Sequence, residues 1–326
     1  MAELRWHPLT QDWVMIASNR QARPQMPKDY CPFCPSFGNV PDYEVLKYDN
    51  DFPALSQNPP KPDDVANEFF KTAESYGKCE VILYSPNHTQ TIKELDDGHM
   101  KKLVDLWCER FAALSADERV KYVFIFENRG DVVGVTMPHP HGQIYAYPFL
   151  PKKLQLETAS AREYLAEHGR CIFCDMLKNE LEFEQRIIFR NEAFTVFLPF
   201  FTEYPYGVYI MSNSHKQYIT EFTEEERALL GITIRDVAGM LDSLFDYSFP
   251  YMMCMHNGPV NGEEDTSESF HFHIEFFPPM RSADKQKFNA SSETGAWAHC
   301  NPTCPEETSK ELRAAYQKYL ASKSGK

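Results

Sequence analysis

The sequence predicts an α+β fold made of two similar halves, and three repeated features lead to this prediction. A Cys-x-Phe-Cys motif occurs at residues 31–34 and again at residues 171–174. Each motif is followed by a strand-like apolar run with a histidine behind it, then by a helical pattern and a second strand-like run. Each half closes on a His-x-His pair, at residues 139–141 and 271–273. The same ordered set of elements in both halves indicates a duplicated unit.

Each half offers a strand, a long helix whose apolar residues recur every three or four positions, and a second strand. In the first half these elements are expected at residues 81–84, 100–114 and 122–126. In the second half they are expected at residues 208–211, 230–244 and 251–255. We therefore predict two antiparallel sheet halves, each with one long helix.

The boundary between the halves is expected between residues 150 and 168, which gives an N-terminal half of residues 1–150 and a C-terminal half of residues 151–326. Residues 57–66 contain three prolines and polar side chains, a composition that is typical of a surface loop. The amphipathic pattern of residues 306–320 predicts a last helix.

Composition narrows the possible partners of the chain. Its 326 residues carry a formal net charge of -14, whereas a general binder of nucleic acid or anionic membranes needs a basic surface. No apolar run is long enough for a transmembrane helix, and the first residues show no signal-peptide pattern. We expect a cytoplasmic protein, in which the paired cysteines are better interpreted as metal ligands than as disulfides.

A first metal site is predicted in the N-terminal half. Two thiolates and two imidazoles form a set that suits tetrahedral zinc, and its members are Cys31, Cys34, His88 and His139. Four protein ligands leave no open position, so such a zinc ion is structural. It would hold His139 and, through Pro140, set the direction of His141. The alternative is two core histidines beside a chance cysteine pair.

A second metal site is predicted in the C-terminal half, with two possible ligand sets. By the same logic as in the first half, one set is Cys171, Cys174, His215 and His271. The other set is Glu157, His256, His271 and His273, which suits iron as well as zinc. His271 cannot serve two separate sites, and the sequence leaves both sets open.

His141 is the predicted nucleophile. In an extended segment, residues two apart point the same way, so one histidine of the pair can be held while its neighbour faces a site. Neutral imidazole is a competent nucleophile near pH 7. Gln143, two residues further along, is placed to bind an oxygen of the group that His141 attacks.

From about Trp6 to Lys287 the chain resembles galactose-1-phosphate uridylyltransferases of the histidine-triad superfamily. The likeness rests on Phe126-Glu127-Asn128, Gly134, His139-Pro140-His141-Gly142-Gln143, His256-Asn257-Gly258-Pro259, Asn261-Gly262-Glu263-Glu264 and His271-Phe272-His273. It implies a uridylylated His141 whose phosphoryl group is oriented by Gln143. It also implies the substrate-binding residues Arg20, Arg23, Asn50, Asp51, Asn128, Thr136, Lys287, Phe288 and Glu293. The set Glu157, His256, His271 and His273 matches the second metal positions of the family.

The resemblance further implies a reaction and a partner. UMP would pass from UDP-glucose to galactose 1-phosphate through a covalent uridylyl-histidine with ping-pong kinetics, in a homodimer. Met137 departs from the family, which commonly has asparagine there, and residues 295–301 look like a branch that includes ADP-glucose phosphorylases. Two alternatives therefore stay open: a nucleotide-sugar phosphorylase or hydrolase that uses the same histidine, and a non-catalytic binding module organised by zinc.

Overall fold

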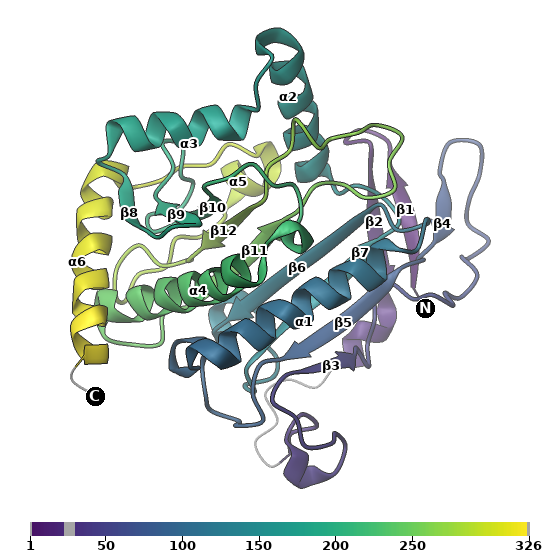
Figure 1. Cartoon of the computed structure of the whole chain (residues 1–326). Coiled ribbons are helices and arrows are strands. Elements are labelled where there is room, and N and C mark those ends of the chain that lie inside the picture. The colour runs from purple at the N-terminus through teal and green to yellow at the C-terminus, as the bar shows by residue number, and fades with distance from the viewer. Residues whose placement is uncertain (1, 23–29, 325–326) are drawn as a thin grey trace.

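The computed structural model describes residues 2–22 and 30–324, and its centre is one nine-stranded antiparallel sheet that runs through both halves of the chain (Figure 1). From one edge to the other, the strands are β3 (Leu46–Asp49), β5 (Lys78–Leu83), β7 (His141–Tyr147), β6 (Tyr122–Arg129), β11 (Tyr251–His256), β12 (His273–Phe277), β10 (Tyr209–Ser212), β9 (Phe194–Phe197) and β8 (Ile187–Arg190). The predicted α+β class and its four strands are confirmed.

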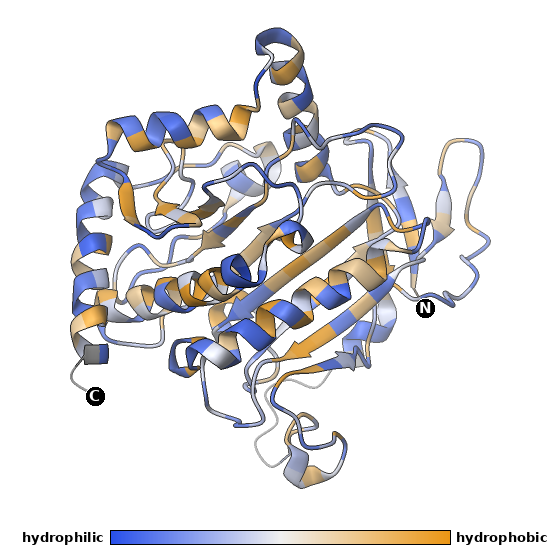
Figure 2. Cartoon of the chain, viewed as in Figure 1, coloured by the Kyte–Doolittle hydropathy of each residue, from blue (hydrophilic) through white to orange (hydrophobic). Residues whose placement is uncertain are grey.

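The two sheet halves are joined edge to edge, which the sequence pattern does not reveal. β6 of the first half pairs with β11 of the second, with Phe126 opposite Cys254. Each strand thereby supplies the hydrogen-bond partners that the other would lack at a free edge. Figure 2 shows apolar residues along these central strands.

Two long helices lie side by side on the same face of the sheet (Figure 1). They are α1 (Asp97–Ser115) and α4 (Glu224–Phe245), which confirm the two predicted helices. Asp96 caps the first turn of α1, and Thr223 with Glu226 forms a capping box at the start of α4. The helices approach closely at Gly231, where an added Cβ would lie 3.0 Å from the Met100 backbone.

The opposite face of the sheet carries a small second sheet that the sequence pattern does not predict. Its strands are β2 (Asp12–Ala17), β1 (Ala2–His7) and β4 (Thr72–Glu74), in this order. Leu4 and Trp13 of this sheet pack in one apolar cluster with Cys79 and Tyr145 of the large sheet. The small sheet thereby covers one end of this face. The start of β7 lies beside the cavities that are described below.

The segment between the halves is helical, whereas the sequence analysis expected only a boundary there. It forms α2 (Lys152–His168), and α3 (Ile172–Phe183) follows. The last helix, α6 (Pro305–Ser324), confirms the amphipathic prediction and packs on α4 with the Tyr319 ring over Gly239. The short helices are α5 (Ser291–Ala296) and the 3-10 turns η1 (Ser18–Ala22), η2 (Pro35–Phe37), η3 (Ile92–Glu94), η4 (Asp131–Val133) and η5 (Ile219–Glu221).

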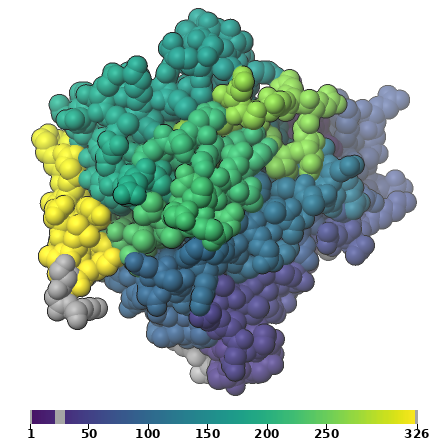
Figure 3. Space-filling view, viewed as in Figure 1, coloured from purple at the N-terminus to yellow at the C-terminus, as the bar shows by residue number. Residues whose placement is uncertain are grey.

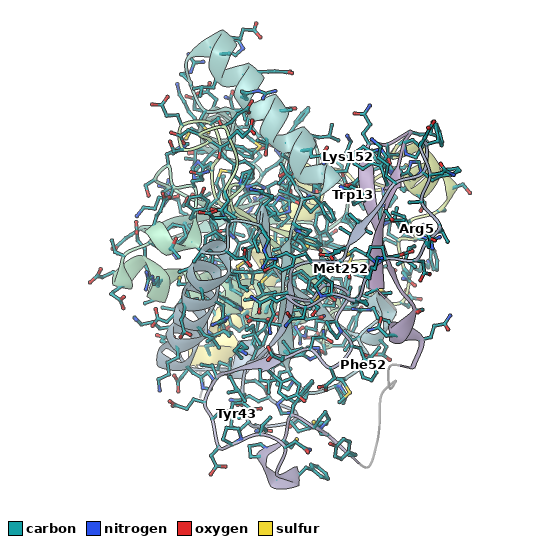
Figure 4. The ribbon with its side chains drawn as sticks, turned by 90° about the vertical axis from the view of Figure 1, so that its right-hand side faces the viewer. Arg5, Trp13, Tyr43, Phe52, Lys152 and Met252 are labelled. Atoms are coloured by element: carbon teal, nitrogen blue, oxygen red, sulfur yellow. The ribbon has the colours of Figure 1, made fainter. Side chains whose placement is uncertain are left out.

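α6 lies along one edge of the molecule, at the end away from the first strands (Figure 3). Turned by 90°, the molecule shows Lys152 at the start of α2 and Tyr43 at the opposite end (Figure 4). Residues 57–66 lie outside helices and strands, as predicted. Among the described helices, none has the length and apolar character that a membrane span requires.

Candidate active site and metal-binding groups

The first Cys-x-x-Cys pair meets two histidines from distant parts of the chain. The four residues are Cys31, Cys34, His88 and His139, and their ligand atoms lie within 4.8 Å of one another. The Cys34 Sγ is 3.3 Å from the His88 Nδ1 and 3.5 Å from the His139 Nδ1. Ligand atoms around a tetrahedral zinc ion at ~2.0–2.3 Å lie about 3.3–3.8 Å apart, so the donor set and its spacing suit zinc.

The ring of His139 is oriented from its other side. Its Nε2 donates to the Ser85 carbonyl at 2.8 Å, which leaves the Nδ1 lone pair facing the thiols. The Tyr43 hydroxyl lies 2.9 Å from the same Nε2. Burial lowers the pKa of His139 to about 4, so the ring is neutral near pH 7, as a metal ligand must be.

His141 is the first residue of β7, two residues after His139. Its Nδ1 donates to the His139 carbonyl oxygen at 2.7 Å, so the proton is on Nδ1 and the lone pair is on Nε2. The Phe33 ring, from the first Cys-x-x-Cys motif, lies 5.7 Å from the His141 ring. The direction of the predicted nucleophile is therefore set by the neighbouring Cys2His2 group.

Two small cavities meet at His141, with volumes of about 300 and 210 Å³. The larger is lined by Arg20, Phe126, Asn128, Thr136, Gln143 and Tyr145. Asn128 lines both cavities, and the Thr136 hydroxyl is buried without a hydrogen-bond partner among the described residues. Both side chains offer polar groups to a bound ligand.

Arg20 and Gln143 are linked through Tyr145, which the sequence analysis did not single out. Arg20 donates to the Tyr145 hydroxyl at 3.0 Å, and that hydroxyl donates to the Gln143 amide oxygen at 3.5 Å. Gln143 and Tyr145 point to the same side of β7 because they are two residues apart. This alternation is the signal that identifies Tyr145 once β7 is known.

Asn50 and Asp51, which were also predicted to bind substrate, lie outside these cavities. The Asn50 amide oxygen accepts from the Phe52 backbone, and the Asp51 carboxylate accepts from the Tyr48 hydroxyl. Their loop reaches the site through the Phe52 carbonyl, 3.4 Å from the Arg20 guanidinium. Arg23 lies outside the described residues.

The predicted hexose-side segment is attached to the second half. The Lys287 ammonium lies 3.5 Å from the Glu293 carboxylate and 5.0 Å from the centre of the Tyr204 ring. Phe288 is 69% exposed. None of the three residues Lys287, Phe288 and Glu293 lines either cavity at His141.

Glu127 is a buried carboxyl group in the wall of the smaller cavity. The Tyr251 hydroxyl donates to it at 3.3 Å, and burial raises its pKa to about 7. The folded-state pKa thus exceeds the unfolded value, so the stabilising contribution of the protonated form is complete below pH 4.5. This contribution is lost as the pH rises through 7.

We therefore expect Glu127→Gln to flatten the pH dependence of stability. Between pH 4.5 and 7 the wild type should lose ~3 kcal/mol of unfolding free energy through this group, because one pKa unit corresponds to about 1.4 kcal/mol. Urea unfolding at several pH values measures the difference, with Glu68→Gln as the exposed control. An unchanged pH dependence would show that Glu127 ionises normally.

In the second half, the cysteine pair and the acidic residue belong to two separate groups. Cys171, Cys174, His215 and His271 form a second Cys2His2 group, in which the Cys174 Sγ lies 3.3 Å from His215 and 3.4 Å from His271. The set that was expected to compete for His271 must be corrected. Glu157, His256 and His273 gather around Glu275 instead, with ligand atoms within 4.8 Å of one another.

The start of β12 explains this division. His273 is the first residue of the strand and points to the sheet face, whereas His271 precedes the strand and turns toward the thiols. The first half behaves in the same way, with His141 in β7 and His139 before it. Glu275, like Gln143, is two residues into its strand, and no repeated motif marks it in the sequence.

Comparison with known proteins agrees with this geometry. A family model for the N-terminal domain of galactose-1-phosphate uridyl transferase matches residues 1–151, and the model for the C-terminal domain matches residues 157–313. The chain is 41% identical to a galactose-1-phosphate uridylyltransferase of Thermotoga maritima, over 96% of this chain and 98% of the relative. It is 32% identical to one of Haemophilus influenzae, over 89% and 87% of the two chains.

Solved structures give the same grouping. A uridylyltransferase structure superposes with a TM-score of 0.89 at 29% identity and covers 98% of this chain and 99% of that chain. An ADP-glucose phosphorylase from Arabidopsis thaliana, at 22% identity, has a TM-score of 0.74 over 96% of this chain and 99% of that chain. At that identity the second likeness shows a shared fold.

Proposed function

Because the chain belongs to the galactose-1-phosphate uridylyltransferase family, we propose that it transfers UMP between UDP-glucose and galactose 1-phosphate through a covalent uridylyl-histidine at His141. The observation that carries this proposal is the hydrogen bond from the His141 Nδ1 to the His139 carbonyl. With the proton on Nδ1, the lone pair that the proposal requires is on Nε2, and His141 lines cavities that contain polar side chains.

The reaction has two displacements at one phosphorus atom. In the first, the His141 Nε2 attacks the α-phosphorus of UDP-glucose, the nitrogen–phosphorus bond forms, and glucose 1-phosphate leaves with the electron pair of the broken oxygen bond. In the second, a phosphate oxygen of galactose 1-phosphate attacks the same phosphorus, and the pair returns to Nε2. Both leaving groups of the forward and reverse reactions are phosphates, so little proton transfer is needed.

Stabilisation of charge on the phosphoryl oxygens is the main task of the surrounding residues. Gln143, Asn128 and Thr136 offer neutral hydrogen-bond donors, and Arg20 offers a positive charge. The Nδ1 proton of His141, held by the His139 carbonyl, lets the ring carry positive charge while Nε2 is bonded to phosphorus.

The proposal is tested by incubating the protein with UDP-glucose labelled in the α-phosphate, without acceptor. A labelled adduct that galactose 1-phosphate discharges supports it. Discharge only by orthophosphate or water, or an adduct from ADP-glucose alone, would instead identify a phosphorylase or hydrolase. Tight, salt-sensitive RNA binding without any adduct would favour the zinc-organised binding module.

Gln143→Ala is expected to slow adduct formation by ~100- to 1,000-fold, the usual cost of removing one donor to an oxyanion. Gln143→Glu should be slower still, because a carboxylate would repel the phosphoryl oxygens. Single-turnover measurement with labelled UDP-glucose gives both rates, with the exposed Gln57→Ala as control. Equal rates for the glutamate variant and the wild type would remove Gln143 from the phosphoryl site.

We also propose that both Cys2His2 groups bind zinc, which would supply positive charge to hold the thiolates and fix the histidine rings. The first group holds His139 and thereby aims His141, while the second ties α3 to the segment before β12. Thiolate ligands require reduced cysteines, which supports a cytoplasmic location. The carboxylate group around Glu275 has a different composition and is treated below.

A homodimer is proposed because the predicted hexose-side residues lie away from His141 in their own chain. Phe288 is exposed, so a second copy has access to it. We expect a mixture of His141→Ala and a Lys287→Ala/Phe288→Ala variant to regain activity that neither has alone, because one of the two sites in a mixed dimer would be intact. Activity of refolded mixtures measures this, with Lys285→Ala replacing the double variant as control. No regain in proven mixed dimers would place these residues in their own subunit's site.

A further inference from the structure

The group around Glu275 contains a lysine that neither Cys2His2 group has. We propose that the ammonium of Lys153 takes the place of a metal ion there, so that Glu157, His256, His273 and Glu275 form a closed ionic network in this chain. The set of donors by itself resembles a metal site, since two carboxylates and two imidazoles suit zinc or iron. The position of Lys153 argues instead that an ammonium group, and not a metal ion, lies among these donors.

Lys153 reaches the centre of the group from α2. Its ammonium is hydrogen bonded to Glu275 and lies 3.8 Å from the carboxylate of Glu157, one helical turn further along. The Lys153 side chain is half exposed, and its ammonium contacts a carboxylate whose side chain is only 2% exposed. The lysine also lies over the Phe277 ring, at 4.9 Å.

The donors of the group lie close to one another, as those of the Cys2His2 groups do. The Glu157 carboxylate is 2.9 Å from the His256 Nδ1, and the Glu275 carboxylate is 3.5 Å from the His256 Nε2 and 3.6 Å from the His273 Nε2. The Nδ1 of His273 donates to the His271 carbonyl at 3.0 Å. A divalent ion bound to both carboxylates would lie close to the ammonium, and the two like charges would repel each other.

The Cys2His2 groups differ from this group in the charge of their neighbours. The outer nitrogens of His139, His215 and His271 face the carbonyls of Ser85, Ser267 and Ser212, as the Nδ1 of His273 faces that of His271. These neutral partners orient the rings and add no positive charge. The contrast separates two groups that are arranged for a metal from one that contains its own cation.

The internal duplication gives the network a role. Gln143 pairs with Phe126, Phe126 pairs with Cys254, and Cys254 pairs with Glu275, so Gln143 and Glu275 stand at matching positions of the two halves. A carboxylate at the place of the amide would repel a phosphoryl group. In the second half, the ion pair of Glu275 with Lys153 therefore occupies the position that corresponds to the proposed phosphoryl site at Gln143. The same ion pair links α2 to β12.

The group remains reachable from solvent, which makes the proposal testable. A cavity of about 330 Å³ adjoins it, lined mainly by aromatic and aliphatic side chains, with Lys153, Glu157, His273 and Glu275 in its wall. Metal ions can therefore enter once the ammonium is removed.

The test compares metal stoichiometry in the full-length wild type, Lys153→Met and Lys152→Met. Lys152 is the matched control because it neighbours Lys153 on α2 and its ammonium contacts Gln155, which is not a member of the group. Each protein is incubated anaerobically with Zn²⁺ or Fe²⁺, freed of loose ions by gel filtration, and analysed for metal per chain. Ions in the Cys2His2 groups are present in all variants and cancel in the comparison.

We expect the wild type and Lys152→Met to be equal and Lys153→Met to hold about one additional ion, which Glu275→Gln in the same background should remove. A folded Lys153→Met without an additional ion would overturn the proposal. So would loss of an ion on introducing Glu275→Gln into the wild type, a comparison that remains valid if Lys153→Met does not fold.

Discussion

Replacing His141 with alanine is expected to abolish the labelled uridylyl adduct and to lower kcat by about 10,000-fold or more, as removal of a covalent nucleophile does in other enzymes. The variant lacks the only protein atom that the proposed mechanism bonds to phosphorus. The effect should be on chemistry and not on folding, because the His141 side chain is only half-buried. Intact mass after incubation with UDP-glucose, together with steady-state rates, measures both effects.

The matched control is His168→Ala, which removes an exposed histidine at the end of α2. This variant should form the adduct at the wild-type rate. An adduct of undiminished yield in His141→Ala would show that another residue is the nucleophile. Unchanged thermal unfolding of both variants would confirm that the loss is chemical.

The second large effect is expected from Cys34→Ser, which removes a thiolate of the first Cys2His2 group. Structural zinc in small zinc-binding peptides contributes ~10–16 kcal/mol, which is comparable to the whole stability of a typical domain. The apolar cluster around this group is small, since it consists of Cys31, Phe33, Cys34, Val40, Val81, Leu83 and Met137. We therefore expect loss of one zinc ion, local unfolding of residues 31–48 and loss of adduct formation.

Metal analysis, hydrogen exchange of residues 31–48 and the labelling assay measure these three effects. The matched comparison is Cys174→Ser, at the equivalent position of the second group. It should also lose one zinc ion but keep most of its labelling activity, because the second group does not orient His141. Equal loss of labelling in both variants would mean that either group supports the site only through global stability.

Much of the site could be predicted from the sequence because its key residues lie in short motifs. The two Cys-x-x-Cys pairs, the His-x-His pairs and the strand and helix patterns between them are local in the chain. Their order predicted the duplicated α+β fold, the long helices and the companions of His139. The sequence also predicted that one histidine of the pair is held while its neighbour faces a site, but the two rings diverge because His139 precedes β7 and His141 begins it.

Contacts between distant segments that carry no motif could not be predicted in this way. The pairing of β6 with β11, which makes one sheet of two halves, joins residues more than 100 positions apart, such as Phe126 and Cys254. The small sheet beside β5 and β7 depends on which apolar surface remains uncovered after the large sheet has formed. Neither is marked by a local pattern.

The two groups of potential metal ligands in the second half show most clearly which features the sequence predicts and which depend on the fold. The sequence by itself determined that two cysteines, four histidines and an acidic residue were available there. Only the tertiary structure decided that His271 joins the thiols, that Glu275 completes the other group and that Lys153 lies against it. The physical reason is that side-chain direction depends on where β12 begins and on how α2 packs against it, and both depend on contacts across the whole fold.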